Sequence, residues 1–484
     1  MRRLTELMGA PLAKDVEIAG LTADSRAVAP GFLFAALVGT KADGRDFVPA
    51  ALAQGAVAIL APEGSRLDLP AGVVLITDPH PRRKLAQLAA AFHGAQPATM
   101  VAVTGTNGKT SVAMFYGQIM ERLGVKSAAI GTLGIVAKGW DNAGGLTTPD
   151  PSALHANLAR LAEFGITHAC MEASSHGLDQ YRLDGVRLKA AAFTNLTRDH
   201  LDYHGDMEAY ARAKLRLFAE VLPETGTAVI NLDSEAGPRF AEACAQRGVK
   251  VLSYGKAGSE LRLIAASPKP FGQELTLEVL GKPVTVKLPL AGLFQAYNVL
   301  AALGLALASG ADTGKALAAL ASLDGVPGRL QKVAERANGA AVFVDYAHTP
   351  DALETVLKAL KPHAARRLVV VFGCGGDRDP GKRPQMGAIG CRLADAMIVT
   401  DDNPRSENPD AIRAAVLGGC CGAVEIGNRR EAIRTAVAGL QKGDVLVIAG
   451  KGHETGQVIG TTTHPFDDAE EARAAILAAD GRLS

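Results

Sequence analysis

The sequence predicts an α/β protein of about three domains with mostly parallel sheets. Short runs of valine, isoleucine and leucine alternate with alanine-rich amphipathic stretches, which is the pattern of buried strands followed by helices. The chain has 484 residues, enough for about three domains that each bury a core of their own. A glycine-rich turn between one such strand and a helix has the form of a phosphate-binding loop. These observations place a nucleotide-binding α/β domain in the chain.

The expected elements follow from these apolar patterns. Buried strands are expected where three to five apolar residues stand between turn residues, at residues 73–76, 101–103, 340–344, 368–372, 396–399 and 445–448. Helices are expected where apolar residues recur three or four positions apart, at residues 48–54, 81–92, 111–123, 154–164, 207–220, 296–309, 313–321 and 469–478. The sequence shows no internal repeat or low-complexity tract.

Two breaks in this pattern predict the domain boundaries. Residues 93–97 read His-Gly-Ala-Gln-Pro, and residues 324–329 read Asp-Gly-Val-Pro-Gly-Arg, both of which are rich in the residues that end helices and strands. We therefore expect an N-terminal domain over residues 1–94, a central domain over 95–326 and a C-terminal domain over 327–484. Alternating segments at 275–279 and 284–288 flank Gly281-Lys282-Pro283, which predicts an antiparallel hairpin inserted in the central domain.

The phosphate-binding loop occupies residues 104–111, which read Thr-Gly-Thr-Asn-Gly-Lys-Thr-Ser. Gly105 and Gly108 allow backbone N–H groups to approach phosphate oxygens, and the helix that follows directs its positive end at the same anion. Lys109 can reach the outer phosphates, and the Thr110 hydroxyl can bind Mg²⁺. The loop has two fewer residues between its glycines than the common G-x-x-x-x-G-K-[ST] form. The competing interpretation is a glycine turn with a solvated lysine.

Two further polar clusters follow strand-like runs in the same domain. Met171-Glu172-Ala173-Ser174-Ser175-His176 and the segment 193–202 around His200 stand where parallel strands should end, and α/β sheets bind ligands at those ends. Glu172 can supply an oxygen ligand to a nucleotide's magnesium ion, and His200 a nitrogen. Taken alone, Glu172 is as compatible with a solvated or capping role, and His200 with a core position.

Lys214 lies within the expected helix 207–220. Arg212 and Arg216 are four residues apart and share one helix face, whereas Lys214 points elsewhere. Periodicity alone favours a surface lysine.

The C-terminal segment holds four polar clusters, each directly after an apolar strand. They read Asp345-Tyr346-Ala347-His348-Thr349-Pro350, 373–379 (Gly-Cys-Gly-Gly-Asp-Arg-Asp), 401–405 (Asp-Asp-Asn-Pro-Arg) and 449–454 (Ala-Gly-Lys-Gly-His-Glu). One such cluster could be a turn. Four of them predict that one edge of a second sheet forms a site facing the nucleotide across a domain cleft.

Composition excludes several classes of protein. The formal net charge is +1, so no broad basic field points to nucleic acid or to an anionic membrane. Met1-Arg2-Arg3 is not followed by an apolar segment, and no run approaches the length of a membrane span, so we expect a cytoplasmic enzyme.

None of the six cysteines lies in a C-x-x-C pair, which predicts neither a zinc site nor a disulfide framework. Cys420 and Cys421 are expected to be two small apolar residues.

Taken together, the motifs resemble one family. TGTNGKTS, MEASSHGLDQYR, TNLTRDHLDYHG, AYARAKLRLF, DYAHTPDAL, GCGGDRD, DNPR and GKGHE are similar to the motifs of the ATP-dependent Mur ligases of peptidoglycan synthesis, in the type that adds meso-diaminopimelate. The resemblance runs from Asp24-Ser25-Arg26 to Glu454. It implies an N-terminal domain for a UDP-sugar, a central ATPase domain with a mostly parallel sheet, and a C-terminal Rossmann-like domain for the incoming amino acid.

The resemblance also implies roles for individual residues. The uridine end of UDP-N-acetylmuramoyl-L-Ala-D-Glu would contact Ser25, Thr40, Lys41 and Ala42, and its muramoyl-dipeptide would contact Thr147, Thr148, Ser174, Gln180 and Arg182. ATP would be bound by Gly105, Thr106, Asn107, Gly108, Lys109, Thr110, Ser111, Asn298, Arg329 and Asp345. Thr110, Glu172 and His200 would surround Mg²⁺, and Lys214 would carry a carbamate, so that Lys109, Lys214, His200 and Glu172 form the catalytic set. Diaminopimelate would contact Arg378, Asp402, Asn403, Pro404, Arg405, Gly450 and Glu454. This sequence departs from the family's pattern at Gln295, where the family often has asparagine. The departure affects only a local detail near the adenine.

The activity implied is amide synthesis through an acyl phosphate, with ATP as co-substrate, Mg²⁺ as cofactor, small-molecule substrates as the only partners and a monomer as the expected state. Three alternatives stay open. An NTP-hydrolysing motor or kinase would share the loop, a nucleotide-regulated scaffold would share the fold without turnover, and a lysine-adding ligase would differ only in its amino acid. Phosphate release with and without the co-substrates separates the first two, and comparing diaminopimelate with lysine tests the third.

Overall fold

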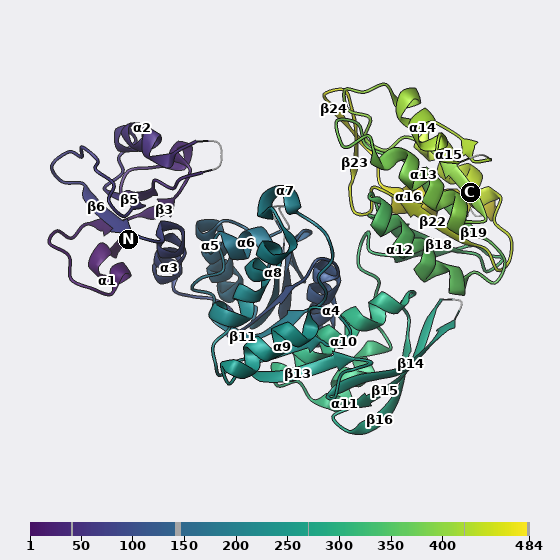
Figure 1. Ribbon diagram of the computed structural model, residues 1–484, viewed down its shortest axis with the longest axis horizontal. Coiled ribbons are helices and arrows are strands. Elements are labelled where there is room, and N and C mark those ends of the chain that lie inside the picture. Colours follow the sequence, from purple (N-terminus) through teal and green to yellow (C-terminus); the bar gives the residue numbers. More distant parts are fainter. Residues whose placement is uncertain (40–41, 141–146, 270, 421, 482–484) are drawn as a thin grey trace. The chain divides into compact units, whose positions relative to one another are not determined.

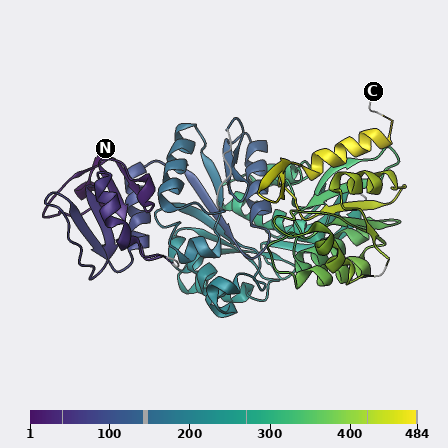
Figure 2. The same cartoon turned by 90° about the horizontal axis from the view of Figure 1, so that it is seen from above.

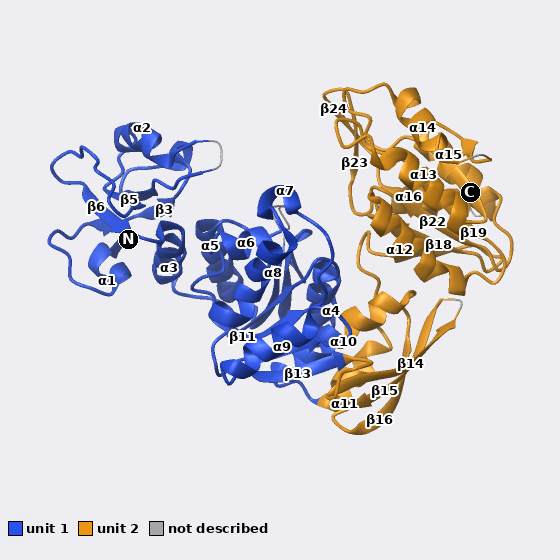
Figure 3. Cartoon of the chain, in the orientation of Figure 1, with its two compact units in different colours: residues 1–254, 301–312 blue, residues 255–300, 313–484 orange. Residues whose placement is uncertain are grey.

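The computed structural model describes residues 1–39, 42–140, 147–269, 271–420 and 422–481 (Figure 1). The chain divides into two compact units, residues 1–254 with 301–312 and residues 255–300 with 313–484 (Figure 3). Thr40 and Lys41, predicted to contact the uridine, and Cys421 lie outside the described residues.

The N-terminal part of the first unit is built on a four-stranded parallel sheet. Its strand order is β3 (Gly20–Thr22), β4 (Phe32–Ala35), β5 (Ala58–Pro62) and β6 (Val74–Asp78). Strands β1 (Arg2–Arg3) and β2 (Glu17–Ile18) form a separate antiparallel pair. The helices are α1 (Leu4–Met8), the short η1 (Ser25–Ala27) and η2 (Gly44–Phe47), α2 (Val48–Ala53) and α3 (Pro81–His93). Buried leucine and alanine side chains of α1 and α3 pack with those of the strands.

A larger sheet forms the rest of the first unit. The strands that this unit contributes to the sheet, in spatial order, are β13 (Lys250–Gly255), β12 (Thr227–Asn231), β11 (Leu188–Phe193), β7 (Thr99–Thr104), β10 (His168–Glu172), β8 (Ser127–Gly131) and β9 (Gly134–Ala137). Every neighbouring pair is parallel except β8–β9. The helices are α4 (Lys109–Arg122), α5 (Pro151–Glu163), α6 (Ser175–Asp179), α7 (Leu201–His204), α8 (Met207–Arg216), η3 (Leu217–Val221), α9 (Gly237–Gln246) and the end of α10 (Leu293–Ala308).

The second unit contains an antiparallel meander and a mainly parallel sheet. The meander consists of β14 (Leu261–Lys269), β15 (Gly272–Val279) and β16 (Lys282–Leu288). The sheet has the order β17 (Gln331–Glu335), β18 (Ala341–Asp345), β22 (Val445–Ala449), β19 (Leu368–Phe372), β20 (Ala396–Val399) and β21 (Val424–Glu425), in which only β17 is antiparallel to its neighbour. Strands β23 (Gly456–Ile459) and β24 (Thr462–Pro465) form a hairpin.

Helices cover both faces of this second sheet. One face packs against α12 (Pro350–Leu360), α13 (Lys382–Leu393) and α14 (Pro409–Leu417). The other packs against α15 (Arg429–Ala438) and α16 (Asp468–Ala479), the yellow helix in Figure 2. The remaining helices are α11 (Thr313–Leu320) and the short η4 (Lys361–His363). The prediction of an α/β fold with mostly parallel sheets is therefore confirmed.

Each expected strand and helix is present, with ends that differ by a few residues. The predicted helix 207–220 is α8 continued by the wider turn η3. The predicted hairpin is the pair β15–β16. Both predicted domain breaks fall between elements, since residues 93–97 separate α3 from β7 and residues 324–329 separate α11 from β17.

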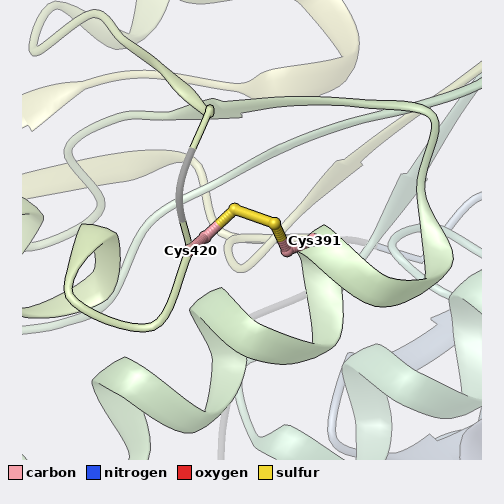
Figure 4. Close-up of a disulfide and its surroundings, with 2 residues drawn as sticks. All are labelled: Cys391 and Cys420. Atoms are coloured by element: carbon pink, nitrogen blue, oxygen red, sulfur yellow. A yellow bond between two sulfur atoms is a disulfide. The ribbon is translucent and has the colours of Figure 1, made fainter.

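One prediction about the cysteines is wrong, because Cys391 and Cys420 form a disulfide (Figure 4). Cys391 lies in the last turn of α13 and Cys420 just beyond α14. Two glycines allow these helices to approach closely: a Cβ on Gly387 would lie 2.0 Å from the Val416 carbonyl oxygen, and one on Gly419 would lie 2.0 Å from that of Pro384. The two cysteine Cα atoms are consequently 5.7 Å apart, within the range that a disulfide spans.

Candidate functional site

The loop between β7 and α4 has the backbone of an anion-binding turn. Gly105 and Gly108 have φ angles of 148° and 91°, a region that favours glycine. A Cβ on Gly105 would lie 1.9 Å from the Thr194 hydroxyl oxygen, so only glycine fits there. Helix α4 begins at Lys109, and Gly108 before it has no side chain to cap the first N–H groups. Helix N-termini of this kind commonly bind phosphate.

The segment after β11 holds this loop in place. The Thr106 N–H donates to the Asn195 carbonyl over 2.8 Å, and the Asn107 N–H donates to the Asn195 side-chain oxygen over 2.9 Å. The Thr194 hydroxyl donates to the Asn107 carbonyl over 2.6 Å. The Thr197 N–H donates to the Thr106 hydroxyl. Two motifs that are about 90 residues apart in sequence thus form one rigid turn.

Lys214 of α8 reaches the same loop. Its side chain is only 1% exposed, and its Nζ donates to the Gly105 carbonyl over 2.8 Å. Lys109 Nζ also donates to that carbonyl, over 2.8 Å, and to the Thr106 carbonyl over 2.7 Å. Burial, reinforced by the positive charge of Lys109, holds the pKa of Lys214 well below its usual range. Periodicity alone predicted a surface lysine, and that prediction is wrong because α8 is covered by the loop.

Glu172, at the end of β10, is 2% exposed. Its side chain is held by Thr132, which follows the neighbouring strand β8. Its two carboxylate oxygens accept from the Thr132 N–H over 2.8 Å and from the Thr132 hydroxyl over 3.3 Å. A Cβ on Gly131 would lie 2.0 Å from a Glu172 oxygen. Thr110 and Glu172 line one small cavity between α4, β8 and β10.

Thr110 and Glu172 are the polar residues in the lining of this cavity, whose other lining residues are apolar or glycine. A hydroxyl and a carboxylate are oxygen ligands of the type that Mg²⁺ prefers, with the remaining positions taken by water and phosphate. His200 does not line this cavity; its side chain is 48% exposed and packs edge-on against His176, with ring centroids 4.9 Å apart. Within the described part of the chain, no three histidine, cysteine, aspartate or glutamate side chains converge to hold a metal on their own.

The residues predicted to hold the muramoyl-dipeptide form a second cluster beside Glu172. The Thr148 hydroxyl donates to the Glu172 carbonyl over 2.9 Å and lies 3.0 Å from the Ser174 hydroxyl. Arg182 donates to the Thr148 carbonyl over 2.6 Å and to the Gln180 side-chain oxygen over 2.8 Å. Thr147 joins this cluster through the Thr132 hydroxyl, 3.1 Å away. All five predicted residues therefore lie together.

The uridine-end residues are less connected. Ser25 begins the short helix η1, which Asp24 caps. The Ser25 carbonyl accepts from Gln54 over 2.9 Å, and the Ala42 carbonyl accepts from the Gly39 N–H over 2.9 Å. These bonds order the local backbone without joining Ser25 to Ala42.

In the second unit, Asn298, Arg329 and Asp345 cluster around Gln295. Gln295 is 1% exposed, donates to the Arg329 carbonyl over 3.0 Å and accepts from Asn298 over 3.0 Å. Asp345 accepts from the Leu330 N–H over 2.6 Å and from the Ala347 N–H over 2.8 Å. Burial raises the pKa of Asp345 to about 6, against the opposing effects of Arg329 and of these two N–H groups. Gln295, the residue that departs from the family pattern, thus contacts Asn298 and Arg329, two of the residues predicted to bind ATP.

The predicted diaminopimelate residues lie at one edge of the second sheet. Strands β18, β22, β19 and β20 are adjacent and parallel, so the four polar clusters that follow them share this edge, as predicted. Asn403 donates to Glu454 over 2.9 Å, and Arg405 donates to the Gly376 carbonyl over 2.8 Å. Asp402 and Pro404 are buried, Gly450 lies beside Asp402, and Arg378 is exposed. The motifs DNPR and GKGHE therefore form one hydrogen-bonded cluster.

Comparisons with known proteins agree with this geometry. Residues 17–93 match the Mur ligase catalytic domain family, 103–306 the Mur ligase middle domain and 328–452 the Mur ligase glutamate ligase domain. The UDP-N-acetylmuramoyl-L-alanyl-D-glutamate--2,6-diaminopimelate ligase of Caulobacter vibrioides is 56% identical over 99% of both chains, and that of Bradyrhizobium diazoefficiens is 53% identical over 96% of both. The chain belongs to the Mur ligase family. A solved diaminopimelate ligase of this family has a TM-score of 0.76 and 36% identity over 99% of each chain, which confirms the three-domain architecture.

Backbone strain in this Mur ligase concentrates at the candidate sites. Among described residues other than glycine, six have φ between 49° and 59°, a conformation that costs energy and recurs at functional positions. Five lie in or beside the predicted site residues, and the sixth, Leu280, lies in the β15–β16 turn; the five are Tyr181, His200, Leu330, Asp377 and Arg405.

Sequence reasoning missed three residues of the Mur ligase sites. Thr132 fixes Glu172 but belongs to no quoted motif. Tyr210 lies within AYARAKLRLF, bonds the Thr106 hydroxyl over 3.1 Å and faces Lys214, whose Nζ is 4.5 Å from the ring centroid. Lys451 lies within GKGHE and is fully buried. Within the described ranges, every helix is too short or too polar to traverse a lipid bilayer.

Proposed function

We propose that this Mur ligase joins meso-diaminopimelate to the D-glutamate of UDP-N-acetylmuramoyl-L-Ala-D-Glu, with ATP as co-substrate. The observation that carries the proposal is that Asn403, Arg405 and Glu454 lie at one edge of the second sheet, where Asn403 donates to Glu454 and Arg405 to the Gly376 carbonyl; a carboxylate and a guanidinium are the groups that an amino-acid head group needs. The names of the relatives at 56% and 53% identity support the same substrates. Because the reaction consumes ATP, we place it in the cytoplasm, and we expect a monomer.

The first step forms an acyl phosphate. The D-glutamyl carboxylate attacks the γ-phosphorus of ATP, the bond to the β,γ-bridging oxygen breaks, and ADP leaves. Lys109 and the loop N–H groups of residues 105–111 would stabilise the charge on the transferring phosphoryl group. Asn298, Arg329 and Asp345 would contact the adenosine.

The second step forms the amide. An amine of diaminopimelate attacks the acyl carbon, loses its proton and expels inorganic phosphate. Ser25, Thr40, Lys41 and Ala42 would hold the uridine end, while Thr148, Arg182 and their neighbours would hold the dipeptide. Arg378, Arg405, Asn403 and Glu454 would orient the incoming amino acid. These groups position reactants, which is the main contribution of a protein to such a transfer.

Thr110 and Glu172 would hold Mg²⁺, which would neutralise phosphate charge when bound. Lys214 would carry a carbamate, formed when its neutral amine adds CO₂ and releases a proton. The low pKa of Lys214 supports this modification, because the attacking amine must be unprotonated.

Phosphate release by the full chain tests the proposal. Release that requires both UDP-N-acetylmuramoyl-L-Ala-D-Glu and diaminopimelate supports it. Release that ignores both co-substrates indicates an NTPase, absence of release indicates a scaffold, and release with lysine in preference to diaminopimelate indicates a lysine-adding ligase.

A further inference from the structure

The side chain of Lys451, two residues beyond β22, is completely buried beside the predicted amino-acid site, the cluster formed by the motifs DNPR and GKGHE. Its Nζ donates to the Asn403 side-chain oxygen over 2.9 Å and to Glu454 over 3.3 Å, and lies 3.6 Å from an Asp402 oxygen. A buried ammonium is costly unless such partners surround it. A lysine at this position needs a reason beyond packing, because an apolar side chain would fill the same space at a lower cost in free energy.

Lys451 determines which way the Asn403 amide faces. An ammonium group can only donate, so the Asn403 atom beside it must be the oxygen. The Val458 N–H donates to the same oxygen over 2.9 Å. The Asn403 amino group is consequently directed at Glu454, to which it donates over 2.9 Å.

Lys451 and Asn403 together hold Glu454. Both donate to the same carboxylate oxygen of Glu454. The Glu454 side chain nevertheless keeps 34% of its surface exposed, which leaves it accessible to an incoming donor. A carboxylate fixed on one side and open on the other is preorganised for a ligand ammonium.

The charges of the side chains around Lys451 also favour a ligand ammonium. Lys451 contributes one positive charge, while Asp402 and Glu454 contribute two negative charges. The buried Arg429 also acts on both carboxylates, but its charge is matched by its own partner Asp468. The Asp402 oxygen that lies 3.6 Å from Lys451 Nζ is buried and has no hydrogen-bond partner among the described residues. A ligand ammonium would balance this group of side chains, and a neutral ligand would not.

We propose that Lys451 is a positioning residue of the amino-acid site, which fixes Asn403 and Glu454 in the orientation that receives an ammonium group of diaminopimelate. This inference rests on the proposed function, because it takes diaminopimelate as the occupant. Lys451 itself does not touch the substrate; it acts through its two partners.

The test compares four variants of the full chain: Lys451→Met, Lys451→Gln, Glu454→Gln and the double variant Lys451→Met with Glu454→Gln. Calorimetry gives the Kd of diaminopimelate, and steady-state kinetics give the three KM values. We expect Lys451→Met to raise the Kd and KM for diaminopimelate about ten- to a hundredfold, with the KM values for ATP and the UDP-substrate within about twofold. Lys451→Gln keeps a donor without the charge and should lose less.

The double variant decides whether Lys451 acts through Glu454. In the Glu454→Gln background, Lys451→Met should add only about a twofold loss, because the two residues form one unit. Arg336→Gln is the matched control: it breaks another largely buried ion pair of the same unit, with Asp480 at 2.6 Å, and should lower Tm without changing the KM for diaminopimelate.

Three outcomes would overturn the inference: unchanged diaminopimelate binding in Lys451→Met, a parallel rise of all three KM values that follows Tm as in Arg336→Gln, or full additivity in the double variant. If Lys451→Met does not fold, Lys451→Gln decides by the same criteria. A parent enzyme that binds no diaminopimelate would instead refute the proposed function.

Discussion

The ammonium groups of Lys109 and Lys214 donate to the same acceptor, the Gly105 carbonyl oxygen, each over 2.8 Å. Two like charges on one oxygen in a buried place repel each other, and the more buried group yields its proton more readily. Burial, and after it the charge of Lys109, lowers the pKa of Lys214 and so favours its neutral amine, although the two lysines are 105 positions apart on different helices.

Lys214 should be carbamylated in the purified enzyme. Its low pKa makes the amine available to CO₂, and the anion formed would lie close to Lys109. Mass spectrometry under non-acidic conditions should show the added mass of one CO₂, which increases with bicarbonate and is absent in Lys214→Ala. Lys358, whose side chain is 62% exposed, serves as an internal control that stays unmodified. Full activity of Lys214→Ala at low magnesium would contradict the assignment.

Lys109→Ala should lower kcat by at least about 10²–10³, the usual cost of losing one preorganised charge at a transferring group. The fold should remain, because the change removes a loop charge and no core contact. The fraction of carbamylated Lys214 should also fall, since Lys109 no longer depresses the pKa of Lys214. Lys126→Ala, an exposed lysine beyond α4, is the control. Product formation near the parent rate would refute the phosphate-loop assignment.

The sequence was sufficient to predict what depends on local pattern. Strand β19 has the predicted ends because an apolar run of that length between polar segments has few other solutions. The phosphate loop could be located because its glycines are needed by a backbone that the motif specifies. The clusters after β18, β19, β20 and β22 could be assigned to one edge because parallel strands end together.

Contacts between distant segments could not be predicted in the same way. Lys214 is buried only because the loop 104–111 covers α8, and nothing in the helix pattern of residues 207–220 indicates that cover. Thr132 holds Glu172 although it lies 40 residues earlier in the chain, just after the neighbouring strand β8. The disulfide partners are 29 residues apart in sequence and meet only because α13 and α14 pack through glycines.

The Cys391–Cys420 disulfide should stabilise the second unit when it is oxidised. Closing a loop of this length in the unfolded chain is worth about 3 to 4 kcal/mol in the chain-entropy description. Denaturant unfolding of the parent should therefore shift to lower concentration with a reductant, with two additional thiols titrated. The double variant Cys391→Ser with Cys420→Ser should unfold at that lower midpoint with or without reductant. Identical parent curves in both conditions would contradict the expectation.

Asp345 should make stability fall as the pH rises through the weakly acidic range. Its folded pKa of about 6 lies above the usual aspartate value, so the folded state binds more protons than the unfolded state between about pH 4 and 6. Relative to Asp345→Asn, the parent should be most stable below about pH 4, lose up to about 3 kcal/mol by about pH 6, and change no further above it. Urea unfolding of both proteins across this range gives the difference.

Asp444 provides the control of opposite sign. Although burial raises its pKa, hydrogen bonds from Arg367, the Gln441 N–H and Arg366 outweigh that effect and lower it. The advantage of the parent over Asp444→Asn should be present at neutral pH and be lost as the pH falls through the lowered pKa. A pH-independent difference between the parent and Asp345→Asn would show that Asp345 titrates normally.

Arg405 should decide the choice of amino acid. Diaminopimelate carries a carboxylate at its far end that lysine lacks, and a guanidinium can meet it with two parallel hydrogen bonds. Lysine would leave that guanidinium without its partner, and sites built around such a group reject the shorter analogue by roughly 10⁴–10⁵ in kcat/KM. The backbone of Arg405 is held with φ of 51° by the hydrogen bond of its N–H to the Val458 carbonyl, 3.1 Å away.

The measurement is the ratio of kcat/KM for diaminopimelate over lysine. In Arg405→Ala the ratio should collapse through loss of diaminopimelate use, with lysine use little changed. Arg405→Lys should recover only part of it, because an ammonium replaces the two-pronged contact by a point charge. Arg392→Ala, which removes an exposed arginine of α13, should keep the parent ratio. If DNPR is simply a turn before a helix, the parent itself will discriminate little, and a parent that prefers lysine would overturn the specificity while leaving the ligase assignment in place.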